Sequence, residues 1–362
     1  MKIVFDCRYT RIGRHDGISR YGARLVEELS KLHPVTMLIS DKRQLELLPD
    51  LPWEMAPSPT GITEPWVARH VNKLKPDVVF TPMQTMGPFG RDYALVTTVH
   101  DLIYYKHPTP PRNLPWAVRV MWRIYHLTWA FQRALLNRAD AHVTDSLATR
   151  DQMLEHKLTK RPISVVTLGT DGPAESAVRK IPSTRELVYM GSYMPYKNVG
   201  LIARALHDLP GYTLHLMSRA DDSTKAELTA LAPEASLIFH NGASDAVYAE
   251  TLSRATALVS ASRDEGFGLP QVEAMVLGTP VLLSDIPIFR EISGHAGGFF
   301  SPDDPAELVR EVKALEDPAT WQSRSTAART RSAEFTWKKG AETLAQVLNE
   351  TVAARSKRAT EK

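Results

Sequence analysis

The stretch "SRDEGFGLPQVEAMVLGTPVLLSD", residues Ser262 to Asp285, combines a loop, a helix and a strand in one short run. The apolar run "ALVSAS" leads into it and predicts a buried strand, and "PVLLS" near its end predicts another. Between them, "RDEGFG" is a loop, and Pro270 suits the first position of a helix, where a missing N–H costs nothing. A buried strand, a helical crossover and a second buried strand form the unit of a parallel sheet.

The same alternation of short apolar runs and amphipathic segments extends along the chain. Because 362 residues exceed one ordinary core, a size of about 150 residues per domain suggests two domains. We therefore predict an α/β fold with two Rossmann-like, doubly wound parallel sheets. The runs are "KIVF", "VTMLI", "DVVF", "LVTTV", "AHVT" and "ISVVTL" in the first half, and "ELVYM", "TLHLM", "SLIF", "ALVS" and "PVLLS" in the second.

A turn-rich segment separates the two predicted domains. "LGTDGPAESAVRKIPSTRE", residues 168–186, interrupts the pattern before the strand "LVYM" restarts it. We expect an N-terminal domain at 1–172 and a C-terminal domain at 173–335. Residues 337–357, "WKKGAETLAQVLNETVAARSK", predict a helix, and the segment 336–362 is expected to pack back toward the N-terminal domain.

Composition excludes several classes of protein. Hydrophobic residues make up 43% of the chain and charged residues 23%, as in ordinary globular proteins. The one cysteine, Cys7, excludes an intrachain disulfide, favours a reducing compartment and is interpreted as a small apolar residue at a strand end. No run approaches the roughly 18 apolar residues of a spanning helix, and "MKIVFDCRYT" lacks a signal-peptide core. A net charge of +3 without a dense basic tract argues against a nucleic acid partner.

Two carboxylates, Glu265 and Glu273, flank the Gly-Phe-Gly-Leu-Pro turn of the opening stretch. Glu265 belongs to the loop at the carboxyl end of a strand, and Glu273 is expected in the first helical turn. Ligands of open parallel sheets bind at that edge, and free amides at a helix start attract anions. Taken alone, Glu273 would be interpreted as a carboxylate that stabilises its own helix by about 0.3 to 1 kcal/mol.

The arrangement of Glu, a seven-residue gap and Glu around G-F-G-L-P resembles that of the retaining family 4 glycosyltransferases. The segments "DGISRY", "VHDLIYYKHP" and "GSYMPYKN" resemble the same family, in order, over most of the chain. The resemblance implies the GT-B fold, in which two Rossmann-like domains face each other across a cleft. It also implies that the N-terminal domain is the acceptor side and the C-terminal domain the nucleotide-sugar donor side.

The resemblance gives these carboxylates separate roles in donor binding. Glu265 would contact the hydroxyl groups of the donor sugar, and Glu273 would contact the ribose of the nucleotide. A carboxylate can accept hydrogen bonds from neighbouring hydroxyl groups, each worth about 1.5 to 3 kcal/mol. Backbone amides of Phe267, Gly268 and Leu269 would complete the cradle for the sugar and the phosphate.

A nucleotide-sugar enzyme must also hold a departing diphosphate. Lys197 in "MPYKN" follows a predicted strand and starts a helix, so it can reach the leaving phosphate as a point charge. The alternative is a solvated lysine at a helix start. Family members usually carry an arginine just after the equivalent of Gly191 or just before the lysine, where this chain has Ser192 and Tyr196. The residues that could compensate are Arg219 and Arg263.

Two segments of the N-terminal domain are expected at its ligand-binding edge. Gly17 in "RIGRHDGISRY" precedes a helix, and the resemblance assigns it a contact with the donor phosphate, although the glycine spacing is no dinucleotide fingerprint. His100 and Asp101 end the strand "LVTTV". The resemblance places His100 near the donor sugar and the acceptor, whereas a histidine at a strand end is more often structural. Asp101 would orient His100 or cap the next turn.

The resemblance also implies the chemistry. We expect same-face attack on the anomeric carbon, with the leaving diphosphate helping to take the acceptor's proton. The predicted catalytic residues are His100, Lys197 and Glu265. No cluster of His, Cys and Asp has the spacing of a metal site, and GT-B enzymes usually manage the leaving-group charge without a metal. Neither a metal nor a cofactor is therefore expected.

The segment "NLPWAVRVMWRIYHLTWAFQRALLNRAD" predicts a helical stretch with two different faces. Arg119, Arg123, His126 and Arg133 fall on one stripe at helical spacing. Such a helix can rest on anionic lipid, but the pattern alone favours a core helix with one wet basic face. Contact with an anionic membrane is kept as a hypothesis. The aromatic residues that enrich the remaining surface are Trp116, Trp122, Trp129 and Phe131.

These observations together predict a cytoplasmic glycosyltransferase, peripheral at the inner face of the membrane if the basic helix meets lipid, in the synthesis of cell-envelope polysaccharide or glycolipid. "DGISRY" and "VHDL" resemble bacterial mannosyltransferases of the family. GDP-mannose is thus the first expected donor and a UDP-hexose the second, with a glycan or a lipid-linked acceptor. The alternatives are a GT-B epimerase that cleaves a UDP-sugar without transfer, and a non-catalytic sugar-nucleotide-binding protein.

Overall fold

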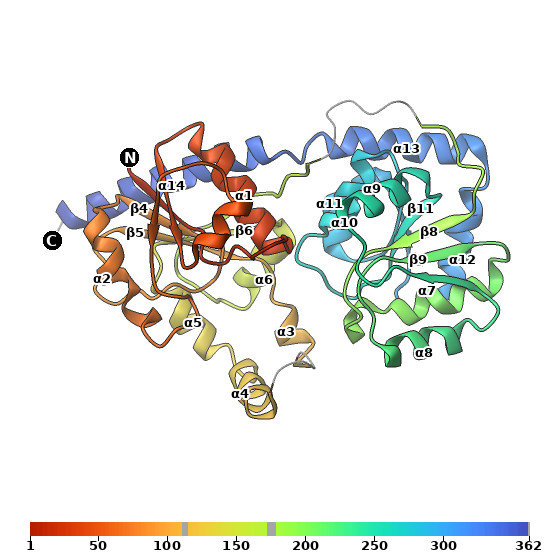
Figure 1. The fold of residues 1–362 in the computed structure, drawn as a ribbon, viewed down its shortest axis with the longest axis horizontal. Coiled ribbons are helices and arrows are strands. Elements are labelled where there is room, and N and C mark those ends of the chain that lie inside the picture. The colour runs from red at the N-terminus through yellow and green to blue at the C-terminus, as the bar shows by residue number, and fades with distance from the viewer. Residues whose placement is uncertain (111–114, 172–178, 361–362) are drawn as a thin grey trace. The chain divides into compact units, whose positions relative to one another are not determined.

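The computed structural model forms two compact units, each with its own sheet (Figure 1). The residues that it describes are 1–110, 115–171 and 179–360. The first unit consists of residues 1–169 and the segment from Thr336 onward, and the second of Thr170–Phe335. The predicted boundary between residues 172 and 173 lies outside the described residues.

The first unit is built on a seven-stranded parallel sheet with the order β3-β2-β1-β4-β5-β6-β7. Ile3 of the central strand β1 lies opposite Val35 of β2 on one side and Val78 of β4 on the other. The strands are β1 (Ile3–Asp6), β2 (Val35–Ile39), β3 (Trp53–Met55), β4 (Val78–Thr81), β5 (Ala94–Val99), β6 (Ala141–Thr144) and β7 (Ile163–Val165). The helices are α1 (Gly17–Ser30), α2 (Val67–Val71), α3 (Ile103–Lys106), α4 (Trp116–His126), α5 (Ala130–Leu136), α6 (Leu147–Glu155) and α14 (Trp337–Thr360).

The second unit repeats this plan with six parallel strands in the order β10-β9-β8-β11-β12-β13. The predicted α/β class, with two doubly wound sheets, is therefore confirmed. The strands are β8 (Glu186–Tyr189), β9 (Thr213–Leu216), β10 (Ser236–Phe239), β11 (Ala257–Ser260), β12 (Val281–Ser284) and β13 (Gly297–Phe300). The helices are α7 (Val199–Ala205), α8 (Asp222–Leu231), α9 (Asp245–Arg254), α10 (Leu269–Val276), α11 (Pro287–Ser293), α12 (Pro305–Ala314) and α13 (Pro318–Ser332).

Burial and capping explain why these segments form these elements. Every residue of β1, β4, β6, β11 and β12 is buried, as expected for strands covered on both faces. Polar side chains cap the first turns of the helices that follow β1 and β6. Asp16 accepts a hydrogen bond from the Ser19 amide at the start of α1, and Ser146 accepts one from the Thr149 amide at the start of α6.

The last helix, α14, completes the core of the first unit. The ring of Trp337 lies 6.4 Å from that of Tyr21 on α1. A Cβ on Gly340 would lie 2.8 Å from the carbonyl oxygen of Thr167, so the close approach of the two backbones requires glycine. The helix runs to Thr360 rather than ending near the predicted residue 357. Its buried aliphatic side chains are Ala341, Leu344, Ala345, Val347 and Leu348.

Three elements differ from the sequence-based expectation. The edge strands β3 and β13 were not predicted, because each residue of β3 is exposed and β13 begins with two glycines. The helical segment around Trp122 is divided into α4 and α5 by a break at 127–129. Arg133 is therefore on α5, where its guanidinium donates to the backbone carbonyls of His156 and Lys157, and the single basic stripe was wrong.

Candidate functional site

Each sheet has one point at which its strand order changes direction. In the first unit this point lies between β1 and β4, and in the second between β8 and β11. Loops that leave neighbouring strands at such a point diverge to opposite faces of the sheet, which leaves room for a ligand at the carboxyl ends. The predicted site residues Lys197 and Glu265 lie in the segments that follow β8 and β11.

The second unit brings Lys197 and Glu265 into direct contact. The Lys197 ammonium donates to Glu265 Oε1, and both side chains are 14% exposed. The hydroxyl of Ser262 donates to the same carboxylate oxygen at 3.1 Å. Lys197 ends a 3₁₀ turn, Pro195–Lys197, two residues before α7, so it does not itself start the α-helix. A cation and a carboxylate at this edge can bind phosphate and hydroxyl groups side by side.

The turn before α10 has a backbone that needs glycine. Gly268 has φ +100°, and a Cβ there would lie 2.6 Å from Oε1 of Gln271. The Phe267 side chain is buried edge-on against Phe335, with ring centroids 5.7 Å apart, so only the Phe267 backbone can meet a ligand. Leu269 is the first residue of α10.

The placement of Glu273 corrects one expectation. Because α10 begins at Leu269, Pro270 is its second residue and Glu273 its fifth, beyond the first turn. The stabilisation of a carboxylate by a helix dipole falls off within that turn. Self-stabilisation of the helix is therefore a poor explanation for Glu273, which is half-buried on the helix that starts at the ligand-binding edge.

The positions that lack the expected arginine are open to solvent or held by backbone contacts. Ser192 is exposed, and the carbonyl of Tyr196 accepts a hydrogen bond from the Arg263 amide at 2.8 Å. The Arg263 guanidinium itself pairs with Asp303 at 2.6 Å. Arg219, just beyond the end of β9, is exposed at the same edge of the sheet.

In the first unit, His100 is held by both ring nitrogens. Nδ1 lies 2.6 Å from Oδ2 of Asp145, and Nε2 lies 2.8 Å from the carbonyl oxygen of Pro82. Both partners are acceptors, so both nitrogens must carry hydrogen. Burial lowers the pKa of His100, but the Asp145 carboxylate, the hydrogen bond to it and the Pro82 carbonyl together raise that pKa to about 9. His100 is thus an imidazolium at neutral pH, which can stabilise negative charge but cannot accept a proton.

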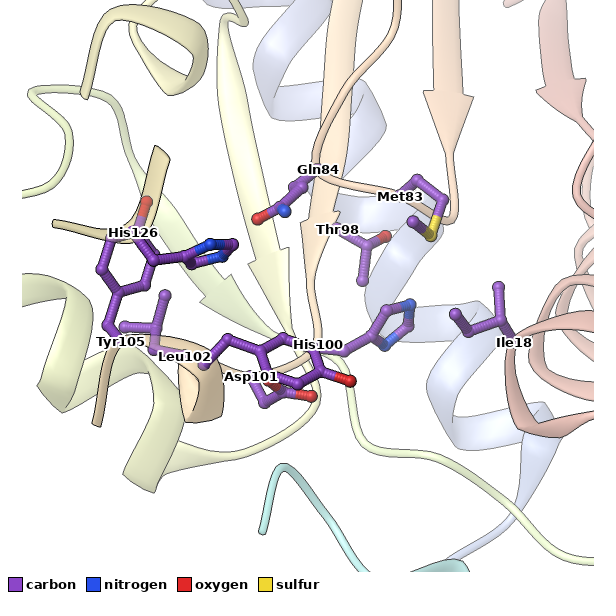
Figure 2. A pocket seen from close by; sticks show the side chains of 10 residues that line it. Ile18, Met83, Gln84, Thr98, His100, Asp101, Leu102, Tyr105 and His126 are labelled. Atoms are coloured by element: carbon purple, nitrogen blue, oxygen red, sulfur yellow. The ribbon is translucent and has the colours of Figure 1, made fainter. Parts of the chain in front are cut away.

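A cavity of about 190 Å³ lies at the carboxyl ends of β4 and β5 (Figure 2). His100 and Asp101 line it, and Asp101 also accepts a hydrogen bond from the Ile103 amide, which caps the following turn. Ile18 lines the cavity as well, and the neighbouring Gly17 is the exposed first residue of α1. The remaining lining residues are Met83, Gln84, Thr98, Leu102, Tyr104, Tyr105 and His126.

Sequence reasoning missed the carboxylate that determines the state of His100. Asp145 directly follows β6, in "AHVTDS", at the same edge of the sheet as His100 after β5. The argument that selected His100 by its place at a strand end therefore applied to Asp145 too. Among the described residues, no group of three or more His, Cys, Asp or Glu side chains is placed to hold a metal ion.

Two family models match the chain in tandem and together cover most of it. The model described as "Glycosyltransferase Family 4" matches residues 15–172, and that described as "Glycosyl transferases group 1" matches residues 173–331. The chain belongs to glycosyltransferase family 4. This confirms the family that the motifs around Glu265 indicated. No helix in the described parts of this family 4 chain is long and apolar enough to cross a membrane.

The curated relatives of this family 4 chain include mannosyltransferases that match it over short segments. The serotype-specific mannosyltransferase WbdA of Escherichia coli is 38% identical over 102 residues, which are 28% of this chain and 12% of WbdA. The O-antigen chain mannosyltransferase RfbU of Salmonella typhimurium is 45% identical over 64 residues, or 18% of each chain. The chain thus spans less than a fifth of the length of these two relatives. Glycogen synthase of Mycobacterium tuberculosis is 29% identical over 271 residues, 71% of this chain and 63% of that one.

Solved structures resemble the chain over nearly its whole length. Sucrose-phosphate synthase from Thermosynechococcus elongatus aligns with a TM-score of 0.71 at 18% identity, over 98% of this chain and 99% of the other. HepE from Anabaena, in complex with UDP and glucose, aligns with a TM-score of 0.70 at 18% identity, over 97% and 100%. At such identities the likeness shows the fold, which for this family 4 chain is GT-B.

Proposed function

We propose that the chain transfers a hexose from a nucleotide diphosphate sugar to a glycan or a lipid-linked acceptor, with retention at the anomeric carbon. The first proposed donor is GDP-mannose, which supplies mannose. The observation that carries the proposal is the contact of Lys197 with Glu265 at the point where the strand order of the second sheet reverses. The mannosyltransferases WbdA and RfbU support mannose as the sugar, since they are relatives at 38% and 45% identity over the segments they share.

The residues of the second unit suggest how a donor would be bound. Lys197 would leave Glu265 and meet the diphosphate, whose negative charge it stabilises as the sugar departs. The freed Glu265 carboxylate would accept hydrogen bonds from the sugar hydroxyl groups, with Ser262 holding its orientation at 3.1 Å. Glu273 would bind the ribose, and the amides at the start of α10 would face the phosphate. In this scheme Lys197 supplies the cation, so no metal is required, and the diphosphate takes the acceptor's proton.

A thermal-shift panel of GDP-, UDP- and ADP-sugars tests the donor. A donor at 100 times its Kd should stabilise the unit that binds it by about 2.7 kcal/mol, and among the sugars of the panel we expect GDP-mannose to give this shift. A shift only with a UDP-hexose would move the proposal to that donor. Release of nucleotide without transfer to any added acceptor would indicate an epimerase, and tight binding without turnover a non-catalytic binding protein.

Variants of the ion pair test the site itself. Glu265→Gln keeps the shape of the side chain but removes its charge, so kcat/KM should fall roughly 10- to 100-fold, the loss of a charged hydrogen bond. Lys197→Ala should weaken binding of GDP much more than binding of guanosine. Lys225→Ala, on the exposed end of α8, is the matched control and should change neither. Equal losses of GDP and guanosine in Lys197→Ala would argue against its phosphate role.

We also propose that α4 rests on an anionic membrane surface. None of its described side chains is fully buried, so the interpretation as a core helix was wrong. Trp116, Val120 and Ile124 of α4 recur at helical spacing and are 79, 47 and 53% exposed. Leu127, directly after the helix, is 76% exposed. Arg123 is exposed beside this apolar stripe. In Figure 1, α4 lies away from the sheet of its unit. Apolar side chains bordered by an arginine suit the boundary between acyl chains and anionic headgroups.

Vesicle flotation tests this contact. The full chain should float with phosphatidylglycerol vesicles and much less with phosphatidylcholine vesicles. The double variant Trp116→Ser, Leu127→Ser should lose flotation, because burial of each side chain in the interface stabilises the bound state by about 1.5 to 3 kcal/mol. Ile62→Ser is the control, since Ile62 is 93% exposed elsewhere on the same unit. Failure of the unsubstituted chain to float, or equal loss in the control, would exclude α4 as the anchor.

A further inference from the structure

The cavity beside His100 has the composition of a binding site for a small polar ring. Its walls are largely aromatic and apolar, with Tyr104 and Tyr105 on α3 and His126 on α4, and a few polar groups converge on it (Figure 2). Its volume of about 190 Å³ equals the liquid volume of roughly six waters, enough for one sugar ring. The catalytic scheme above uses none of these aromatic side chains.

A chain of hydrogen bonds fixes the orientation of Gln84, which lines this cavity. The Tyr125 hydroxyl donates to Oε1 of the buried Gln132 at 2.8 Å. This sets the Gln132 amide so that its Nε2 donates to Oε1 of Gln84 at 2.6 Å. The carbonyl end of Gln84 is therefore engaged, and its Nε2 is left with N–H groups for a ligand.

His126 offers the opposite hydrogen-bonding character in the same cavity. Its Nδ1 lies 2.7 Å from the carbonyl oxygen of Trp122, so Nδ1 carries the hydrogen. Burial lowers the pKa of His126, which keeps the ring neutral and leaves Nε2 as an acceptor. Gln84 as a donor and His126 as an acceptor are complementary to hydroxyl groups, which both donate and accept.

We propose that this cavity binds a pyranose ring of the acceptor, with Gln84 donating to one of its hydroxyl groups, His126 accepting from another, and Tyr104 and Tyr105 forming the apolar wall. The inference rests on the proposed glycosyl transfer and names the residues that select its acceptor. Tyr125 and Gln132 are positioning residues, because they act only through Gln84. An acceptor without the matching hydroxyl groups would leave buried polar groups unpaired, which is the strongest way for a site to reject an analogue.

The probes for the test are octyl mannoside, octyl glucoside and octyl galactoside, with GDP-mannose as the donor. Binding to the full chain is measured by saturation-transfer NMR, and transfer by mass-spectrometric detection of the octyl dihexoside product. Gln84→Met keeps the length of the side chain but can form no hydrogen bond to a hydroxyl group, so hexoside affinity should fall roughly tenfold, with the KM for GDP-mannose unchanged. Tyr125→Phe lets the Gln132 amide turn over and should give a smaller rise in the KM for the hexoside. Gln322→Met on α13 makes the same change outside the cavity and should have no effect.

The outcomes separate this inference from the proposed function. Binding that depends on Gln84 without transfer from any donor would refute the transferase and leave the cavity assignment standing. Transfer with an unchanged KM for the hexoside in Gln84→Met would refute the cavity assignment and leave the transferase standing. If no octyl hexoside binds the unsubstituted chain, or if Gln322→Met weakens binding as much as Gln84→Met, the cavity is not the acceptor site.

Discussion

At the scale of single residues, His100 shows how a local environment changes the chemistry that a side chain can perform. An exposed histidine with an ordinary pKa near 6.5 could take a proton at neutral pH. Here the carboxylate of Asp145 and the carbonyl of Pro82 both require a hydrogen from the ring. The sequence placed His100 at a ligand-binding edge, but only the position of Asp145 indicates that its role is that of a cation or a donor.

A titration of His100 provides a direct check. Because the folded pKa is about 9 and the ordinary value is 6.5, the stabilisation by the pair is complete below pH 6.5 and is lost as the pH rises through 9. The imidazole ¹⁵N resonances of His100 should therefore titrate near 9. In Asp145→Asn this pKa should fall, and the free energy of unfolding of the first unit should decrease by about 3 to 5 kcal/mol for a broken buried pair.

His142 is the internal control for that titration. It is buried on β6 between the hydroxyls of Thr97 and Thr159, and burial lowers its pKa to about 4. Its resonances should stay those of a neutral ring over the whole pH range of the titration, in the unsubstituted chain and in Asp145→Asn. A His100 pKa below 7 in the unsubstituted chain would contradict the assignment of an imidazolium.

Two glycines of the predicted site should separate structural from functional effects. A Cβ on Gly17 meets no atom within 4 Å, whereas Gly268 has φ +100° and a Cβ there would lie 2.6 Å from Gln271. Gly268→Ala should therefore lower stability by about 1 to 2 kcal/mol, the cost of a left-handed backbone in an L-residue. Gly17→Ala should leave the melting temperature unchanged, so any loss of turnover would reflect a ligand at that backbone. If Gly17→Ala lost much stability, a loss of turnover in this variant would not be evidence for a ligand at the Gly17 backbone.

At the scale of elements, the sequence predicted every strand inside the sheets and the edge strands β7 and β10, but it missed the edge strands β3 and β13. Interior strands such as β1 must be apolar on both faces, so they stand out as unbroken runs. The edge strand β3 needs no such run, because Trp53, Glu54 and Met55 are all exposed, and it was overlooked. The same limit applies to the site. Lys197 and Glu265 belong to motifs that are visible in the sequence. Asp145 and Gln84 act through partners that are distant in sequence.

The helix α14 should be essential to the unit that it completes. Truncation after Phe335 would remove Leu344, Val347 and Leu348 from the core of the first unit. Each of these side chains contributes about 1.5 to 3 kcal/mol, so the first unit should lose several kcal/mol of unfolding stability. Circular dichroism and proteolysis of the truncated chain should show a loosened first unit and an intact second one. A truncated chain that melts like the full chain would contradict this role.

At the scale of the whole molecule, the two units have separate cores. One buried apolar cluster, which includes Leu187, Leu214 and Trp321, lies wholly within Thr170–Phe335. Others, around Val79 and Val99, lie within the first unit. Units with their own cores need not unfold together, so a single unfolding free energy would not describe this chain.

Calorimetry of the full chain should therefore show two transitions, of which GDP shifts one. The Lys197–Glu265 pair and the start of α10 belong to the second unit, so GDP at 100 times its Kd should stabilise that unit by about 2.7 kcal/mol and leave the other unchanged. Truncation of α14 identifies the transitions, because it should lower only that of the first unit. In Lys197→Ala the shift with GDP should shrink while both transitions remain. If GDP instead raised only the transition that the truncation lowers, the nucleotide would bind the first unit, and the donor site would have been placed on the wrong sheet.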